Sequence, residues 1–324
     1  MVFEMKRIAM VVCLLLAFVM LCGGCTKSDK KAEFPSRRVE IVVGFGPGSG
    51  TDVTSRALSE PLSSVLGVPV TITNIEGSQG LKGLEYVYKQ PNDGYTLFLT
   101  TQTQLITQIY GLSSIKFTEQ FEPVSRLVHD VTLVTANADG RFKNFEELAA
   151  YAKEHPKDVK IAGLAASGLD GMIIRQFVNN SGLELDLVSF GATAECKSAL
   201  LGGHVDLNID EIATAKPLIE AGNLIGIMVL AEERLPGLPD VPCSAEYGIK
   251  ADIGAWRGLS VKKGTDEKIV QKLQESIVKA MEDQRWKDFV ASGMLDQRPG
   301  FATSAQFAEI WKEEYAFFDE MIEK

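Results

Sequence analysis

The sequence predicts an α/β fold in which each of two modules is a mostly parallel sheet flanked by helices. Runs of β-branched apolar residues alternate with segments of helical period, and clusters of Gly, Pro, Asn and Asp separate them. The pattern of strand, turn and helix that begins at Val39 starts again near Asp130. A chain of 324 residues, 45% of them hydrophobic, is long enough for two such modules. Alternating strands and helices favour parallel pairing through right-handed crossovers.

The first strand, turn and helix form the most informative stretch of the chain. Val39 to Val43 reads as a strand, Gly44 to Gly50 as a glycine-rich turn, and a helix opens at Thr51-Asp52. The first N–H groups of a helix have no partner within it, and the helix dipole adds a partial positive charge there. Glycines in the turn let a ligand approach these amides, so the stretch predicts an anion-binding site.

The first module continues with two more strands and a second helix. We expect a strand over 68–74, a helix through Leu84 and Val87, and a strand over 95–99. Pro61 falls within the first helical pattern and either kinks or divides that helix. The loops that follow the strands matter for function, because ligands bind beyond the carboxyl ends of strands in such sheets.

The second module repeats this order. Its expected elements are strands over 130–134, 159–162, 185–190, 205–209 and 224–230, a helix over 144–152 with Asn144 as its cap, and helices near 172–177 and 199–201. Ser167 is the expected cap of the helix that follows the small-residue turn Gly163 to Gly168. Two opposed helix starts, one from each module, would bracket one small molecule. A strand over 255–261 and helices over 267–283 and 304–322 close the chain, and the last helix is expected to pack on the first module.

The N-terminus has the layout of an export signal. Lys6 and Arg7 precede an apolar run from Ile8 to Leu21, which is shorter than a membrane-spanning helix needs to be. Gly23-Gly24-Cys25 resembles the lipobox of bacterial lipoproteins, although Cys22 stands where Leu is usual, so ordinary signal cleavage is the alternative. The expected segments are a signal peptide over 1–24 and a lipid-anchored tether over 25–34, with lipidation at Cys25.

Charge and cysteine content exclude several classes of function. The formal net charge is −10, and loss of residues 1–24 makes it −11, so nucleic acid is not an expected partner. Beyond Cys25 only Cys196 and Cys243 remain, either paired in a disulfide or, by our preferred interpretation, as two buried thiols. The three histidines are scattered and no metal-ligand spacing occurs, so neither a metal nor a cofactor is expected.

Four motifs, in their order and separation, resemble the solute-binding receptors of tripartite tricarboxylate transporters, also called Bug receptors. They are Val42 to Asp52, Pro91 to Leu97, Ala199 to Asp206, and Leu238 to Pro242. The resemblance implies a two-lobed periplasmic binding protein-like fold (type 2), with lobe 1 over 35–129 plus 251–324 and lobe 2 over 130–250. It also implies a monomeric extracytoplasmic receptor that binds a small carboxylate or amino-carboxylate and delivers it to membrane-embedded permease subunits.

The resemblance places the ligand in the interlobe cleft, in loops made largely of backbone amides and hydroxyls. The candidate ligand-binding residues are Phe45, Gly46, Gly48, Ser49, Gly50, Thr51, Asp52, Thr101, Gln102, Leu164, Ala165, Ala166, Ser167, Phe190, Gly191 and Asp210. Basic residues common at the family's cleft are missing here and acids are gained, which favours a monocarboxylate, a neutral solute, or an amino-carboxylate whose ammonium meets Asp170 or Asp210. Asp52 and Asp210 each have a structural role as an equal alternative, and Trp256 is expected in the core.

Three other functions can be compared with the sequence. A dinucleotide-dependent enzyme would need G-x-G-x-x-G, which the turn Gly44 to Thr51 does not contain, and a hydrolase would need G-x-S-x-G, which Pro47 breaks. No catalytic residue is expected. A sensory ligand-binding lipoprotein remains the alternative to a transport receptor. We further expect the lobes to close on the ligand about a hinge at Val128–Asp130 and Lys250–Asp252.

Overall fold

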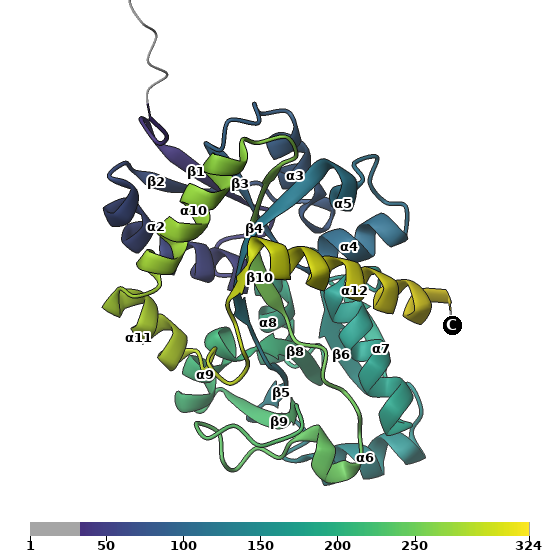
Figure 1. The fold of residues 1–324 in the computed structure, drawn as a ribbon. Helices are drawn as coiled ribbons and strands as arrows, with labels where there is room; N and C mark the ends of the chain where they lie inside the picture. The colour runs from purple at the N-terminus through teal and green to yellow at the C-terminus, as the bar shows by residue number, and fades with distance from the viewer. Residues whose placement is uncertain (1–32, 324) are drawn as a thin grey trace, which may run out of the picture. The chain divides into compact units, whose positions relative to one another are not determined.

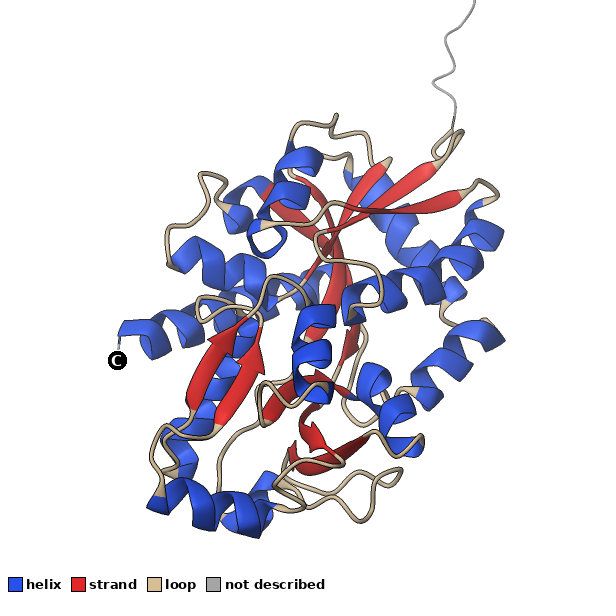
Figure 2. Ribbon diagram, turned by 180° about the vertical axis from the view of Figure 1, so that it is seen from behind, coloured by secondary structure: helices blue, strands red, loops and turns tan. Residues whose placement is uncertain are grey.

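The computed structural model describes residues 33–323, and residues 37–324 form one compact unit. The expected signal peptide, Cys25 and most of the tether lie outside the described residues. Within 33–323, every helix is either too short or too polar to cross a bilayer. The unit contains two β-sheets with helices packed on their faces, which confirms the predicted α/β class (Figures 1 and 2).

The first sheet has six strands in the order β11-β4-β10-β3-β1-β2. Strand β1 pairs in parallel with both β2 and β3, whereas β10 runs antiparallel to β3 and to β4. The strands are β1 (Val39–Val43), β2 (Val70–Asn74), β3 (Thr96–Thr100), β4 (Phe121–His129), β10 (Trp256–Lys262) and β11 (Ala302–Thr303).

The second sheet has five strands in the order β7-β6-β8-β5-β9. Strand β6 pairs in parallel with β7 and β8, and β5 runs antiparallel to β8 and β9. The strands are β5 (Thr132–Asn137), β6 (Lys160–Gly163), β7 (Asp186–Ser189), β8 (Leu207–Glu211) and β9 (Leu224–Leu230).

Both sheets are mixed, and this corrects the expectation that they are mostly parallel. The chain leaves the first sheet through β4, enters the second through β5, and returns through β10. Outgoing and returning strands that lie side by side must run in opposite directions, so β4 and β10 pair antiparallel over their length. Asp130 N donates to Ala255 O at 2.8 Å where the two connecting segments pass each other.

Helices cover the faces of each sheet. They are α2 (Gly50–Leu66), α3 (Leu81–Tyr88), α4 (Gln102–Ile109), α5 (Phe117–Gln120), α6 (Phe145–Glu154), α7 (Leu169–Ser181), α8 (Thr193–Leu201), α9 (Ile212–Glu220), α10 (Glu267–Ala280), α11 (Gln284–Ser292) and α12 (Ser304–Glu323), with 3₁₀ turns η1 (Ser78–Gly80) and η2 (Ser244–Tyr247). The last helix, α12, packs on β4 and α4, as expected for a segment that returns to the first module (Figure 1).

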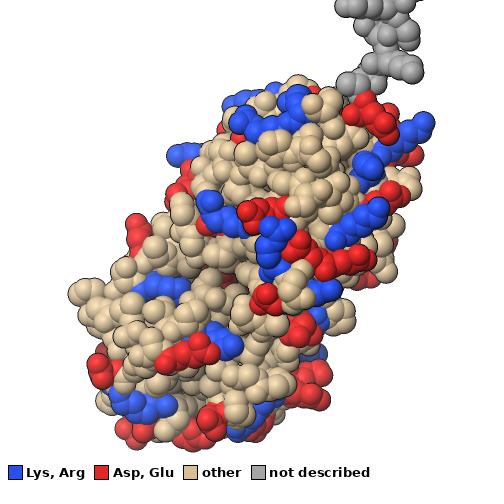
Figure 3. Space-filling view, turned by 90° about the vertical axis from the view of Figure 1, so that its left-hand side faces the viewer, with Lys and Arg blue, Asp and Glu red and all other residues tan. Residues whose placement is uncertain are grey.

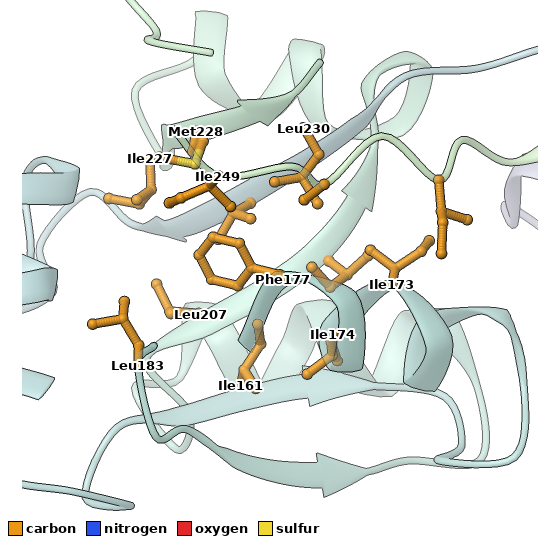
Figure 4. Close-up of a cluster of buried hydrophobic side chains, with 14 of the residues drawn as sticks. Ile161, Ile173, Ile174, Phe177, Leu183, Leu207, Ile227, Met228, Leu230 and Ile249 are labelled. Atoms are coloured by element: carbon orange, nitrogen blue, oxygen red, sulfur yellow. The ribbon is translucent and has the colours of Figure 1, made fainter. Parts of the chain in front are cut away.

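The core of the second sheet shows how α7 is fixed. Phe177, Ile173 and Ile174 of α7 are buried against Ile161 and Leu207 of the strands (Figure 4). Each such side chain contributes about 1.5–3 kcal/mol when it leaves water. This packing holds the start of α7 in a defined place. Trp256 is fully buried in the first half, which confirms it as a core residue.

Several local predictions were corrected. Helix α7 begins at the N-cap Gly168, not at Ser167, and α2 continues through Pro61 without a break. The predicted helix over 267–283 is followed by a separate helix, α11. The pattern also missed β4, α4 and α9. Cys196 and Cys243 are both buried and unpaired, in agreement with our preferred interpretation.

Candidate functional site

An outer cavity of about 230 Å³ lies where strands of both sheets end. Four turns line it, namely those after β1, β2, β6 and β7. The lining residues are Gly44, Phe45, Gly46, Glu76, Gly77, Ser78, Gln79, Gly80, Leu164, Ala165, Phe190, Gly191, Ala192 and Thr193. Because these are the carboxyl ends of the strands, the cavity has the position at which open α/β sheets bind ligands.

Two smaller cavities of about 50 Å³ each, which we call the middle and inner cavities, share Leu164 and Thr193 with the outer one. The middle cavity is lined by Phe45, Ser49, Gly50, Thr51, Thr101, Thr103, Leu164, Leu169, Asp170, Thr193, Glu211, Ala255 and Arg257. The inner cavity adds Thr132, Ile173, Ile209, Asp210 and Thr214. We refer to the three together as the cleft. Its volume suits a small solute rather than a nucleotide.

The turn before α2 is held in shape by hydrogen bonds to Asp52. Its Oδ2 accepts from Gly48 N at 2.9 Å, and Arg56 and Asn74 bind its other face. Burial would raise the pKa of Asp52, but these hydrogen bonds outweigh it and lower the pKa. Asn74 Nδ2 also donates to Phe45 O at 2.9 Å. Asp52 therefore builds the turn and does not line the cleft.

Two glycines let the turns after β1 and β2 meet backbone to backbone. A Cβ on Gly44 would lie 2.6 Å from the Cα of Gly80, which is too close for any side chain. Gly80 itself has a φ of 85°, in the region that favours glycine. The two turns thus pack together and present main-chain atoms to the outer cavity.

The second half supplies the starts of α7 and α8. Asp170, in the first turn of α7, is partly buried and accepts from Leu164 N at 2.8 Å. Burial and the charges of Glu211 and Asp210 raise its pKa to about 6. Helix α8 begins at Thr193, and its N-cap residue Ala192 has no side chain that can cap it. The first N–H groups of α8 therefore lie at the outer cavity without a capping oxygen from Ala192.

A buried arginine lines the middle cavity. Arg257 of β10 is 1% exposed, and its Nη2 lies 2.6 Å from Glu211 Oε1 and 3.5 Å from Asp130 Oδ2. Glu211 ends β8 of the second sheet, so this ion pair joins the two halves across the cleft. Burial, together with the charge of Glu211, raises the pKa of Asp130 to about 7 although Arg257 opposes the shift.

The structure brings most of the predicted binding residues together. The cavities are lined by Phe45, Gly46, Ser49, Gly50, Thr51, Thr101, Leu164, Ala165, Phe190, Gly191 and Asp210. Asp210 is also an internal partner, since its carboxylate pairs with Lys197 and accepts from Thr135 Oγ1 at 2.6 Å.

Five predicted residues do not line the cavities. Gly48 and Asp52 shape the first turn, and the backbone of Ala166 lies directly under Gly171 of α7. Ser167 Oγ accepts from Gln79 Nε2 at 3.0 Å across the mouth of the cleft. Gln102 binds Gly254 O and Trp256 N and so fixes the returning strand.

Sequence reasoning missed Arg257 and Glu211. They come from strands far apart in the chain, and no motif includes either. The available signal was a charged residue inside an otherwise apolar strand, Trp256 to Val261, because such a residue is buried only with a partner.

A larger cavity of about 880 Å³ lies elsewhere in the first half, between α10, α12 and the start of β4. It contains none of the strand-end turns, and its lining comes from one half only. Size alone would favour it, but the position of the cleft at the carboxyl ends of parallel strands in both sheets is the stronger argument. Among residues 33–323, no cluster of three or more His, Cys, Asp or Glu side chains is placed to hold a metal ion.

Comparison with known proteins gives a consistent assignment. Residues 54–324 match the family model described as the tripartite tricarboxylate transporter family receptor. The chain is 30% identical to protein BugT of Bordetella pertussis over 282 residues, which cover 83% of this chain and 86% of BugT.

Solved structures show the same fold. MatC of Rhodopseudomonas palustris with bound malate is 26% identical, with a TM-score of 0.78 over 89% of this chain and 99% of MatC. An R. palustris protein with adipate is 25% identical, with a TM-score of 0.82 over 89% of this chain and 97% of that protein. Both neighbours hold a small dicarboxylate.

Proposed function

Because this chain belongs to the tripartite tricarboxylate transporter receptor family, we propose that it captures a small carboxylate or amino-carboxylate in the cleft and delivers it to a membrane-embedded transporter. Receptors of this family bind solutes and are not enzymes, in agreement with the sequence analysis. The alternative function, that of a sensory ligand-binding lipoprotein, stays an untested prediction. No feature of the cleft favours it over a transport receptor.

The observation that carries this proposal is the convergence of turns from both sheets on the outer cavity. The turns after β1 and β2 belong to the first sheet, and those after β6 and β7 belong to the second. Backbone amides there, with the α8 start at Ala192–Thr193, supply donors for a carboxylate. The bound malate and adipate of two structural neighbours support this ligand class.

The two sheets support two lobes that close on the solute. We assign residues 35–129 plus 251–324 to lobe 1 and residues 130–250 to lobe 2, with the chain crossing between them at Val128–Asp130 and Lys250–Asp252. The first-sheet strands span 39–129 and 256–303, and the second-sheet strands span 132–230, in agreement with this division. A solute that contacts turns from both sheets would stabilise the closed arrangement.

Export and anchoring complete the proposal. The signal over 1–24 would carry the receptor out of the cytoplasm, and a lipid on Cys25 would hold it, as a monomer, at the outer face of the membrane. The charge distribution is compatible with a receptor for small molecules: acidic and basic side chains are interspersed on the face seen in Figure 3. Mass spectrometry of the mature protein tests the anchor, because Cys25→Ser would abolish the lipid adduct.

A thermal-shift screen tests the binding function. Small monocarboxylates, amino acids, dicarboxylates and neutral solutes are added separately, and each hit is confirmed by isothermal titration calorimetry. A solute that binds only the folded protein raises the Tm, by an amount that grows with its concentration. We expect at least one carboxylate to do so. Stabilisation by neutral solutes alone would contradict the proposed ligand class.

A further inference from the structure

The positive charge of Arg257 already has an internal partner in Glu211, and Asp130 lies close to it as well. Glu211 reaches it from the end of β8 and Asp130 from the connection between the sheets, at 2.6 Å and 3.5 Å. The side chains of Arg257 and Asp130 are each 1% exposed, whereas that of Glu211 is 30% exposed and faces the middle cavity. Of these three side chains, the Glu211 carboxylate of the ion pair is therefore the one that a solute in the middle cavity would contact.

Acids outnumber bases around the middle and inner cavities. Asp170 and Glu211 line the middle cavity together with Arg257, Asp130 lies 3.5 Å from the same guanidinium, and Lys197 and Asp210 pair with each other. Burial, with the charge of Glu211 contributing, raises the pKa of both Asp130 and Asp170. The raised pKa values agree with the excess of acidic side chains around these two cavities, because a further negative charge there would be repelled.

Glu211 occupies a position beside α2 that only a glycine leaves open. A Cβ on Gly50, the first residue of α2, would lie 1.9 Å from Glu211 Oε2 and 2.5 Å from Arg257 Nη2. The start of a helix next to a guanidinium is a favourable place for an anion. In this protein the carboxylate of Glu211, from the second half, occupies the position beside the start of α2.

From this arrangement we propose that Glu211 is a specificity-determining residue: its carboxylate occupies Arg257 and excludes a second carboxylate of the solute. The inference rests on the proposed function. The first carboxylate of the solute binds the turn amides at the outer cavity, and its far end points to the middle cavity, which accepts an uncharged or cationic group. The receptor therefore selects against dicarboxylates by placing a like charge where their second acid group would lie.

The test compares solutes of equal chain length that differ only at the far end. Two series are titrated by calorimetry, namely butyrate, succinate and 4-aminobutyrate, and hexanoate, adipate and 6-aminohexanoate. The proteins are the wild type, Glu211→Gln, the charge-retaining Glu211→Asp and the control Glu220→Gln. Glu220 lies on α9, and its largely exposed side chain pairs only loosely with Lys216 at 3.6 Å, so its variant makes the same change in net charge away from the cleft. Circular dichroism confirms that each variant is folded.

We expect the wild type to prefer the amino acid or the monocarboxylate over the dicarboxylate in the series that fits the cleft. Removing the negative charge beside the far end of the solute should raise dicarboxylate affinity, relative to the amino acid, about tenfold or more in Glu211→Gln. Glu211→Asp and Glu220→Gln should keep the wild-type preference.

Two results would overturn the inference while leaving the receptor function intact. One is a wild type that binds dicarboxylates more tightly than their amino acid counterparts. The other is a Glu211→Gln protein with an unchanged ratio of affinities. If no solute of either series binds the wild type or Glu211→Gln at millimolar concentration, the proposed carboxylate receptor is contradicted, and the inference with it.

Discussion

At the scale of single residues, the shape of the cleft depends on two kinds of position. Some are glycines with no room for a side chain, and others are polar residues whose side chains form several hydrogen bonds. Gly50 is the clearest case of a missing side chain, since the ion pair of Glu211 and Arg257 fills the space beside its Cα. Asp52 and Gln102 are cases of full engagement, because each holds a turn or strand in place through several hydrogen bonds. A substitution at Gly50 therefore tests close packing, and substitutions at Asp52 or Gln102 test the loss of hydrogen bonds to buried polar groups.

The Gly50→Ala variant should lose stability although alanine is the better helix former. The gain in helix propensity is about 1 kcal/mol, but the new methyl group would overlap Glu211 Oε2 and displace the ion pair. We expect a net loss of about 1–3 kcal/mol and weaker solute binding. Urea denaturation and calorimetry measure the two effects. A variant as stable as the wild type would show that Glu211 is not held against α2.

The raised pKa of Asp130 predicts that the free energy of unfolding depends on pH, and it also predicts the direction of the change. Its pKa is near 3.8 in the unfolded chain and about 7 in the folded protein, because burial and Glu211 disfavour its charge. Between these pH values the folded state binds more protons, so the free energy of unfolding contributed by Asp130 falls as the pH rises from about 4 to about 7. Each unit of pKa shift corresponds to about 1.4 kcal/mol.

The Asp130→Asn variant removes this titration and keeps the shape of the side chain. Relative to the variant, the wild type should lose stability as the pH rises from 5 to 8. Urea denaturation at several pH values measures the difference. Parallel stability profiles for the two proteins would contradict the raised pKa.

The sequence allowed part of the site to be predicted at this scale. The glycine turn before α2 and the cap Asn144 are local features with local signals, and the structure confirms them. Arg257 and Glu211 could not be found in the same way, because their proximity depends on how β8 and β10 approach across the cleft. Ser167 was wrongly predicted as the cap of α7; its hydroxyl instead accepts a hydrogen bond from Gln79, which lies 88 positions away in the chain.

At the scale of elements, the returning strand β10 is fixed by the start of α4. Gln102 Nε2 donates to Gly254 O at 2.6 Å, and Gln102 Oε1 accepts from Trp256 N at 3.1 Å. Asp130 N adds a bond to Ala255 O beside them. The position of Arg257, the next residue along β10, follows from these contacts.

The Gln102→Ala variant should therefore destabilise the fold and disturb the cleft. It leaves a buried N–H and a buried C=O without partners, which costs about 2–3 kcal/mol. The matched control is Gln271→Ala on α10, an exposed glutamine whose side chain donates to Glu275 one turn further along the helix, for which we expect a loss of less than about 0.5 kcal/mol. Chemical denaturation measures both. Equal effects of the two substitutions would exclude the proposed role of Gln102.

Elements with a clear period were predicted well, and those without one were missed. β4 carries Pro123, Ser125 and Arg126, so its apolar pattern is interrupted, and its place in the sheet depends on pairing with β10. The direction of β4 and β10 likewise follows from the path of the chain between the two sheets. Local patterns do not encode that path, which is why the sheets were expected to be mostly parallel.

At the scale of the whole molecule, two connections carry the chain between the sheets. They run between β4 and β5 and from β9 to β10, and they pass each other at Asp130 and Ala255. At the mouth of the cleft, Gln79 Nε2 of the first half donates to Ser167 Oγ of the second. We propose that one half rotates against the other about these connections.

Solute binding should close the cleft and make the protein more compact. Small-angle X-ray scattering on the mature protein, with and without a saturating panel solute, would measure the radius of gyration. We expect a decrease on binding, because the solute contacts turns from both sheets. Superimposable profiles would contradict closure and leave a rigid cleft as the remaining explanation.

The central claim is that backbone amides from both halves hold one solute without transforming it. Its most direct test is a backbone amide NMR titration of the mature protein with the carboxylate that raises the Tm most. The amides of Gly46 in the first half and of Ala165 and Thr193 in the second should shift together and give the same Kd. Shifts confined to one half, or clustered around the cavity between α10 and α12, would contradict the account.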